Sequence, residues 1–157
     1  MKIVSRLAWL AIFLLLLASL LGLLSCQGKK IFNSIDVTGA DWGKKLSLPN
    51  IEGKLVNIND FEGKVTAVFF GFLSCPDICP NSLGKMVKIK KALGKEAENF
   101  QVIFVTVDSK RDSPRKVKDY LLSFDKDFIG LIAKNDKLNN LKQEFKLVVQ
   151  KKEAKDF

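Results

Sequence analysis

An apolar run that leads directly into two cysteines limits most strongly what this chain can fold into. Residues 65–72, Val-Thr-Ala-Val-Phe-Phe-Gly-Phe, are almost all apolar, and Cys75 and Cys79 follow, each with a proline after it. The run is too short to cross a membrane and is rich in Val and Phe, so it predicts a strand buried on both faces in the centre of a sheet. Open α/β sheets carry their sites at the carboxyl ends of such strands. We therefore expect both thiols at a functional edge of the sheet.

The remaining patterns predict an α/β fold. The expected elements are a hairpin at 46–58, strands at 65–72, 101–107, 128–133 and 147–150, and helices that follow Pro80, Asp112-Ser113-Pro114 and Asn135-Asp136. The order hairpin, β, α, β, α, β, α, β is typical of a sheet with right-handed crossovers. The strand at 147–150 would then lie at an exposed edge of the sheet.

Several residues that could contact a ligand fit the predicted core or helix ends better. Met86 lies in the apolar stripe of the helix after the cysteines, which favours core packing over a role as a soft metal ligand. Trp42 and Phe61 are interpreted as packing anchors. Asp77 and Asp108 could tune thiol acidity or contact a partner, but a capping or solvent-exposed role is favoured.

The amino-terminal segment is expected to export the chain and to tether it to a membrane. Residues 1–25 combine basic residues, an apolar stretch and Leu-Leu-Ser directly before Cys26, which is the pattern of a secretory signal. It resembles a bacterial lipoprotein signal, in which Cys26 would carry the lipid. An uncleaved transmembrane anchor is the alternative, because the apolar stretch is just long enough to span a bilayer. Residues 26–40 are interpreted as a tether and 41–157 as the folded domain, in the bacterial cell envelope and facing the periplasm or the cell exterior.

The charge of the chain limits its partners. Two of the 26 basic residues, Lys2 and Arg6, lie in the signal, so residues 26–157 carry 24 basic residues against 17 acidic ones. Basic side chains beside a membrane anchor would favour an anionic lipid surface. Because the lysines are scattered, a solvated exterior is the favoured interpretation. No cluster of basic and aromatic residues stands out, and together with export this excludes nucleic acid as a partner.

Two thiols at this spacing suit a soft metal or reversible redox chemistry. A structural disulfide is disfavoured, because a bridge that closes so short a loop constrains the unfolded chain little. A structural zinc site needs four ligands, and the chain has no histidine. Cu(I) binds thiolates and accepts fewer ligands, and the dipole of the following helix would stabilise both thiolates. The alternative is a redox-active pair, Cys75 and Cys79, that exchanges disulfides.

Several motifs, in order along the chain, carry a family resemblance. They are Gly39-Ala40-Asp41-Trp42-Gly43-Lys44, Asp60-Phe61-Glu62-Gly63-Lys64, Val68-Phe69-Phe70-Gly71-Phe72, Cys75-Pro76-Asp77-Ile78-Cys79-Pro80, residues 102–108, Arg111-Asp112-Ser113-Pro114 and Phe128-Ile129-Gly130-Leu131. Together they resemble the SCO/SenC family, exported copper-binding proteins that assist assembly of the copper centre of cytochrome c oxidase. The resemblance implies a thioredoxin-like fold with an N-terminal hairpin extension, and Cys75 and Cys79 as ligands of copper, expected as Cu(I). It implies a metallochaperone rather than an enzyme, with the copper-bearing oxidase subunit or another copper protein as partner.

The resemblance is incomplete in the carboxyl-terminal part. In that family a histidine preceded by aspartate is the third copper ligand, and this sequence has no histidine. The family's closing strand and helix are missing as well, so we expect a truncated chain that binds Cu(II) weakly. A thiol-disulfide oxidoreductase acting on cysteines of an oxidase subunit is the alternative, although no proline follows Pro114 to face the thiols. A non-functional truncated remnant is the third hypothesis.

Overall fold

The structure is a computed structural model that describes residues 12, 34–35, 37–40 and 42–150. The chain divides into two compact units, Met1–Ala40 and Asp41–Phe157, and the strands and helices below belong to the second. The predicted signal or anchor and Cys26 lie outside the described residues. Within the described part of the chain, no helix combines the length and the apolar character that a membrane span requires.

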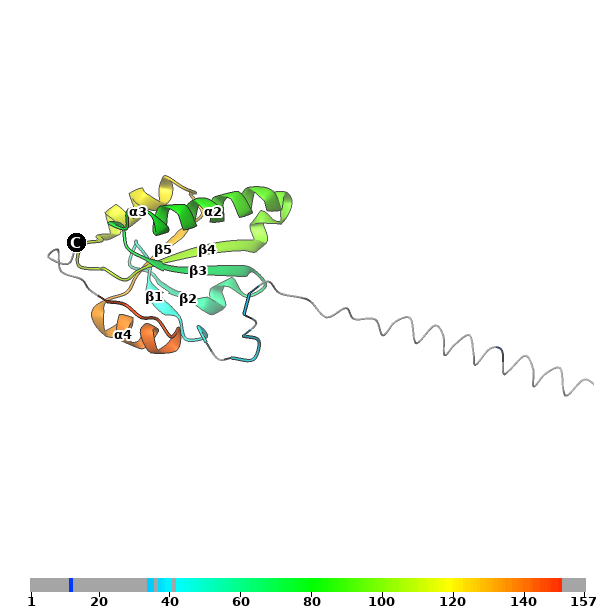
Figure 1. Cartoon of the computed structure of the whole chain (residues 1–157), viewed down its shortest axis with the longest axis horizontal. Helices are drawn as coiled ribbons and strands as arrows, with labels where there is room; N and C mark the ends of the chain where they lie inside the picture. The colour runs from blue at the N-terminus through cyan, green and yellow to red at the C-terminus, as the bar shows by residue number, and fades with distance from the viewer. Residues whose placement is uncertain (1–11, 13–33, 36, 41, 151–157) are drawn as a thin grey trace, which may run out of the picture. The chain divides into compact units, whose positions relative to one another are not determined.

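A three-stranded parallel sheet forms the centre of the second unit. Its strands are β3 (Val65–Gly71), β4 (Phe100–Thr106) and β5 (Ile129–Ile132), in the order β3-β4-β5. Parallel neighbours require crossover connections, and helices α2 (Ile78–Leu93) and α3 (Pro114–Leu122) provide them. Both helices lie on the same face of the sheet (Figure 1).

The other face of the sheet carries a hairpin and the helix α4 (Asn135–Glu144) (Figure 1). The hairpin strands β1 (Ser47–Pro49) and β2 (Leu55–Asn57) pair antiparallel, which confirms the predicted hairpin. Its turn is set by its own residues, because the Asn50 side chain accepts hydrogen bonds from the N–H groups that follow it in the loop. Two short 3-10 helices, Ile58–Phe61 and Gly94–Asn99, complete the elements.

Strand β4 supplies the centre of both hydrophobic layers. Val102 and Phe104 pack with the core residues of α2 and α3, whereas Ile103 and Val105 pack with those of the hairpin and α4. All four side chains are fully buried. Since successive side chains of a strand point to opposite faces, β4 is buried on both faces. The shorter β5 is also buried on both faces, through Leu131 and Ile132.

Strand β3, which the sequence predicts as the central strand, lies at the edge of the sheet. The carbonyl of Gly71 accepts a hydrogen bond from the N–H of Val107, so every second residue of β3 turns its backbone groups toward β4. The backbone groups of Thr66, Val68 and Phe70 face away, and among the described residues no strand pairs with them. In the described part of the chain the prediction of a central strand buried on both faces is wrong, because β3 has one strand neighbour and only Gly71 of its residues is fully buried. Apolar character does not specify how many strands flank a segment.

The predicted strand at 147–150 is also wrong, because these residues have no regular structure. At the end of α4 the N–H of Leu147 donates to the carbonyl of Lys142 (2.9 Å). Lys146 takes a left-handed φ of +53°. This is the Schellman arrangement that ends helices. Val148 beyond it is 86% exposed, so in the described part of the chain the exposed sheet edge belongs to β3 instead.

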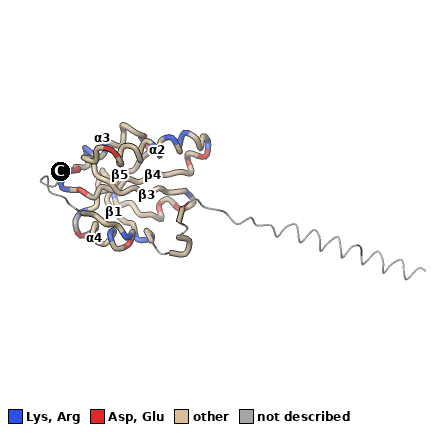
Figure 2. The backbone as a smooth tube through the Cα atoms, in the orientation of Figure 1, with Lys and Arg blue, Asp and Glu red and all other residues tan. Residues whose placement is uncertain are grey.

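The helix ends agree only partly with the sequence patterns. The predicted start of α3 is confirmed, since the Ser113 side chain accepts a hydrogen bond from the N–H of Lys116 and Pro114 is the first helical residue. Helix α2 begins at Ile78, before Pro80, and ends at Gly94 as predicted. Lys134, not Asn135, is the N-cap of α4. Lys and Arg are interspersed with Asp and Glu over the helices (Figure 2), in agreement with a solvated exterior.

Candidate metal centre

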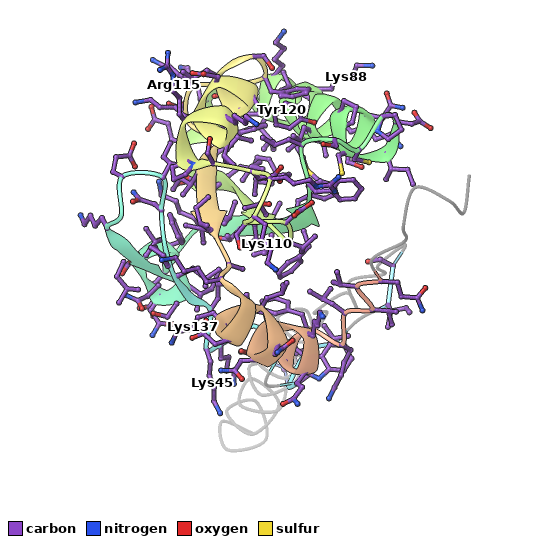
Figure 3. All side chains as sticks on the ribbon, turned by 90° about the vertical axis from the view of Figure 1, so that its left-hand side faces the viewer. Lys45, Lys88, Lys110, Arg115, Tyr120 and Lys137 are labelled. Carbon is purple, nitrogen blue, oxygen red and sulfur yellow. The ribbon has the colours of Figure 1, made fainter. Side chains whose placement is uncertain are left out.

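The two cysteines lie where β3 passes into α2, at the carboxyl ends of the strands. β3 ends at Gly71, the N–H of Cys75 donates to the carbonyl of Phe72 (3.2 Å), and α2 begins at Ile78. The predicted position at this edge of the sheet is therefore confirmed, although the strand that leads to it is an edge strand. Figure 3 looks onto this edge.

Cys75 is a half-buried free thiol just outside the helix. Its Sγ accepts a hydrogen bond of 3.4 Å from the N–H of Cys79, one of the donors that a helix leaves unpaired in its first turn. Partial burial raises the pKa of Cys75, but hydrogen bonds from the Cys79 thiol and from the backbone N–H groups of Cys79, Asp77 and Ile78 outweigh it. The pKa of Cys75 therefore lies below the ordinary thiol value.

Cys79 is also a free thiol but lies inside the first turn of α2, where only 4% of its surface is exposed. Burial raises its pKa to about 11, and the hydrogen bond to Cys75 and the negative charges of Cys75 and Asp112 act in the same direction. The backbone N–H of Phe72 opposes this effect only in part. The two thiols are thus unequal: Cys75 ionises readily, whereas Cys79 holds its proton.

The floor of the site is built by the end of β3 and by the core beneath it. A Cβ atom on Gly71 would lie 2.8 Å from Cε2 of Phe104 and 3.1 Å from both Sγ of Cys79 and Cε1 of Phe69. These distances are shorter than ordinary van der Waals contacts, so a side chain at this position would force its neighbours to shift. The buried Cys79 thiol therefore lies beside the core residues Phe104 and Phe69.

A buried carboxylate joins the thiol loop to β4, and sequence reasoning missed it. Asp112 is 2% exposed, and its Oδ2 accepts hydrogen bonds from the N–H of Leu73 (3.1 Å) and from Oγ1 of Thr106 (2.6 Å). Thr106 in turn accepts from the N–H of Asp108 (3.1 Å). The sequence pattern assigned Asp112 to the helix cap, but Ser113 alone caps α3. The linear pattern holds no signal that separates the two neighbours.

Tyr120 on α3 contributes a buried hydroxyl that has no hydrogen-bond partner among the described residues. Its ring packs against Phe104 and Phe124, with centroid distances of 6.1 and 5.2 Å. Burial raises the pKa of Tyr120, and the negative charges of the Cys79 and Cys75 thiolates raise it further. Figure 3 labels Tyr120 in the view onto this edge of the molecule. Phe104 and Tyr120 belong to the same hydrophobic cluster, which also includes core residues of α2 and α3.

The remaining predicted residues have structural roles or are exposed. Asp77 is the N-cap residue of α2 and accepts a hydrogen bond from the Asn81 side chain, and Asp108 forms an ion pair with Arg111. Met86 and Phe61 pack against the core as predicted. Trp42 is not a buried anchor, because 52% of its surface is exposed.

The two thiols are a sparse donor set. No group of three or more Cys, His, Asp or Glu side chains in the described part of the chain is arranged to hold a metal ion. A structural zinc site would need four ligands. Soft thiolates suit Cu(I), which accepts lower coordination. The residues present therefore fit Cu(I) and do not fit structural zinc.

A parallel sheet with its crossover helices on one face, and two thiols at a strand-to-helix junction, defines a thioredoxin-like protein. Solved structures agree with this class. Bradyrhizobium japonicum ScoI with copper bound is 34% identical and superimposes with a TM-score of 0.64 over 72% of this chain and 74% of that chain. Arabidopsis thaliana ScoI with copper bound is 30% identical, with a TM-score of 0.66 over 73% of this chain and 71% of that chain.

The particular family follows from the sequence comparison. The SCO1/SenC family model matches residues 36–156. The SCO2-like protein of Rickettsia felis is 37% identical over 105 residues, which are 67% of this chain and 51% of that protein. The chain belongs to the SCO1/SenC family, as the resemblance implied. It spans about half the length of the curated relatives it matches.

Proposed function

We propose that this chain is an exported copper-binding protein that assists copper delivery to, and assembly of, the copper centre of cytochrome c oxidase. Cys75 and Cys79 would hold the metal as Cu(I), and the chain would act as a metallochaperone rather than an enzyme. The observation that carries the proposal is the pair of free thiols at the amino end of α2, where the Cys75 sulfur accepts a helix N–H. The copper-bound structures of the two ScoI relatives support the same metal.

The inequality of the thiols suits transfer of a metal between proteins. The accessible Cys75 ionises readily and would engage the incoming ion first, whereas the buried Cys79 gives up its proton only when the metal replaces it. A partner would reach the site through Cys75, because Cys79 is buried. We assign the partner role to the copper-bearing subunit of the oxidase or to another copper protein.

The proposal includes a tether to the membrane of the bacterial cell envelope, with the site facing the periplasm or the cell exterior. Residues 1–25 would be a lipoprotein signal and Cys26 the lipid-bearing residue. Fatty-acid labelling of the expressed chain, with fractionation of the cells, tests this assignment. Cys26→Ser should lose the label and leave the membrane fraction. A Cys26→Ser protein that stays in the membrane indicates an uncleaved anchor instead.

Copper binding is tested by titrating the reduced full-length protein, in detergent and without oxygen, with Cu(I) in competition with a chromophoric chelator. The wild type and Cys26→Ser should each bind a single Cu(I) per chain, since Cys26 is not part of the site. Cys75→Ser and Cys79→Ser should lose this binding. Cu(I) binding that is unchanged in Cys75→Ser would exclude the proposed site. A separate unfolding measurement tests the remnant hypothesis, which the lack of a cooperative transition would support.

A thiol-disulfide oxidoreductase is the second candidate, because a half-buried thiol that ionises readily, beside a buried protonated thiol, is also suited to disulfide exchange. In that reaction Cys75 and Cys79 would give two electrons and two protons to a substrate disulfide and become a disulfide themselves. Equilibration with glutathione buffers measures the reduction potential of the pair, and the reduction of a disulfide-bonded oxidase-subunit peptide reports turnover. A pair that is inert toward the peptide disulfide removes this candidate.

A further inference from the structure

We propose that Asp112 is a positioning residue for the two-thiol site, because its buried carboxylate fastens the loop that carries Cys75 to the end of β4. The purpose that we assign to Asp112 rests on the proposed copper function, whereas the structural test of its role does not depend on copper. Asp112 itself touches neither sulfur in the contacts described, and it acts through Leu73 and Thr106.

The burial of Asp112 calls for an explanation. A carboxylate that is almost fully removed from water costs folding free energy unless it is paired and hydrogen-bonded. Among the described residues no Lys or Arg forms an ion pair with Asp112, and its partners are one hydroxyl and one backbone N–H. Burial of this side chain is thus costly, and both of its hydrogen bonds are made with segments that adjoin the thiols.

The contacts of Asp112 join three segments that are distant in sequence. Leu73 lies in the loop after β3, Thr106 is the last residue of β4, and Asp112 directly precedes the N-cap of α3. A further hydrogen bond, from the N–H of Val107 to the carbonyl of Gly71 (2.9 Å), holds the two strand ends together beside it. The junction therefore fixes the exit of the chain from β3.

Apart from Asp112, the thiol loop is held by the packing of the Leu73 side chain against the hydrophobic core. β3 is an edge strand, so beyond Gly71 the loop has no sheet neighbour on one side in the described part of the chain. Leu73 lies between Phe72, whose carbonyl accepts the N–H of Cys75, and Cys75 itself. A shift at Leu73 would therefore move the Cys75 sulfur away from the N–H of Cys79. Ligands that are held in place before the metal binds lose less conformational entropy on binding, which favours metal affinity.

The negative charge of Asp112 also acts on the buried thiol, since it adds to the effects that raise the pKa of Cys79.

The effects of the hydrogen bonds and of the charge of Asp112 can be separated by substitution. Asp112→Asn removes the charge but retains an oxygen that can accept from Leu73 and Thr106. Asp112→Ala removes both. Asp119→Ala is the matched control, because this carboxylate lies on α3 but is exposed.

The test combines hydrogen exchange of the Leu73 amide, alkylation of Cys75 with iodoacetamide, and Cu(I) competition, all on the full-length chain. Asp112→Ala should speed Leu73 exchange at least about tenfold and weaken Cu(I) binding about tenfold, with a changed rate of Cys75 alkylation. Asp112→Asn and Asp119→Ala should stay within about threefold of the wild type in exchange and Cu(I) affinity. Unchanged Leu73 exchange in Asp112→Ala would overturn the proposal, and so would an Asp112→Asn protein as impaired as Asp112→Ala.

A second pair of variants covers the case in which Asp112→Ala does not fold. Thr106→Val removes the hydroxyl that holds Asp112, and Thr106→Ser keeps it. Thr106→Val should show faster Leu73 exchange than Thr106→Ser, and equal rates in the two would overturn the proposal. If the wild type binds no Cu(I), the copper function fails, but Leu73 exchange and Cys75 alkylation still decide the role of Asp112.

Discussion

Gly71 and Cys79 are close neighbours, because a Cβ atom built on Gly71 would lie only 3.1 Å from the Cys79 sulfur. The same Cβ atom would lie 2.8 Å from Cε2 of Phe104, so the last residue of β3, the buried thiol of α2 and this core residue lie close together. The candidate metal centre therefore adjoins the hydrophobic core, and a substitution that shifts side chains in one should shift side chains in the other.

Gly71→Ala should destabilise the fold by about 1–3 kcal/mol, since the added methyl must displace Phe104, Cys79 or Phe69 in a packed region. It should also change the alkylation rate of Cys79. Gly84→Ala is the control, because nothing lies within 4 Å of its added Cβ on α2, and it should stabilise the helix by about 0.5–1 kcal/mol. Urea unfolding measures both effects. Equal stabilities of the two variants would contradict the contact.

The two thiols should react with iodoacetamide over different pH ranges. The pKa of Cys75 is lowered, so its alkylation rate should reach its plateau below the pH expected of an ordinary thiol. Cys79, with a pKa of about 11, should remain slow until the pH approaches that value. Mass spectrometry of peptides from partially alkylated protein gives the two rates separately. A common pH profile for both thiols would show that the helix end does not distinguish them.

The protonated state of Cys79 should make stability depend on alkaline pH. Its pKa in the folded protein, about 11, lies above the ordinary thiol value of 9.0, so the folded state holds this proton more tightly than the unfolded chain does. This contribution to the free energy of unfolding is fully present below pH 9.0 and is lost as the pH rises through about 11. The difference in stability between the wild type and Cys79→Ala should shrink over that window, whereas a constant difference would speak against the raised pKa.

Tyr120→Phe should leave stability unchanged or raise it by up to about 1 kcal/mol, because the hydroxyl that it removes is buried and has no hydrogen-bond partner in the described part of the chain. The ring contacts with Phe104 and Phe124 remain in this variant. Tyr120→Leu, which loses them, should cost about 1 kcal/mol or more. Thermal and urea unfolding of both variants provide the comparison. A clear loss of stability in Tyr120→Phe would mean that the hydroxyl has a partner such as an ordered water.

Local patterns were sufficient for much of the fold. The hairpin before β3, the start of α3 at Ser113-Pro114 and the end of α2 at Gly94 were all predicted, because side-chain period, capping and glycine conformation act over a few residues. The position of the thiols at a strand-to-helix junction follows from the same local signals. The family resemblance was carried by motifs of this kind, and the comparisons confirm it.

The sequence by itself determined the order of the elements from the hairpin to α4 and the two soft ligands at the end of an apolar strand. Only the tertiary structure decided that β4 and not β3 is central, since the neighbours of a strand depend on packing between distant segments. It also decided that two similar thiols differ, with Cys75 accessible and Cys79 buried, and that Asp112 turns inward beside them. Burial and long-range hydrogen bonds set these properties, and neither is encoded in the spacing of residues along the chain.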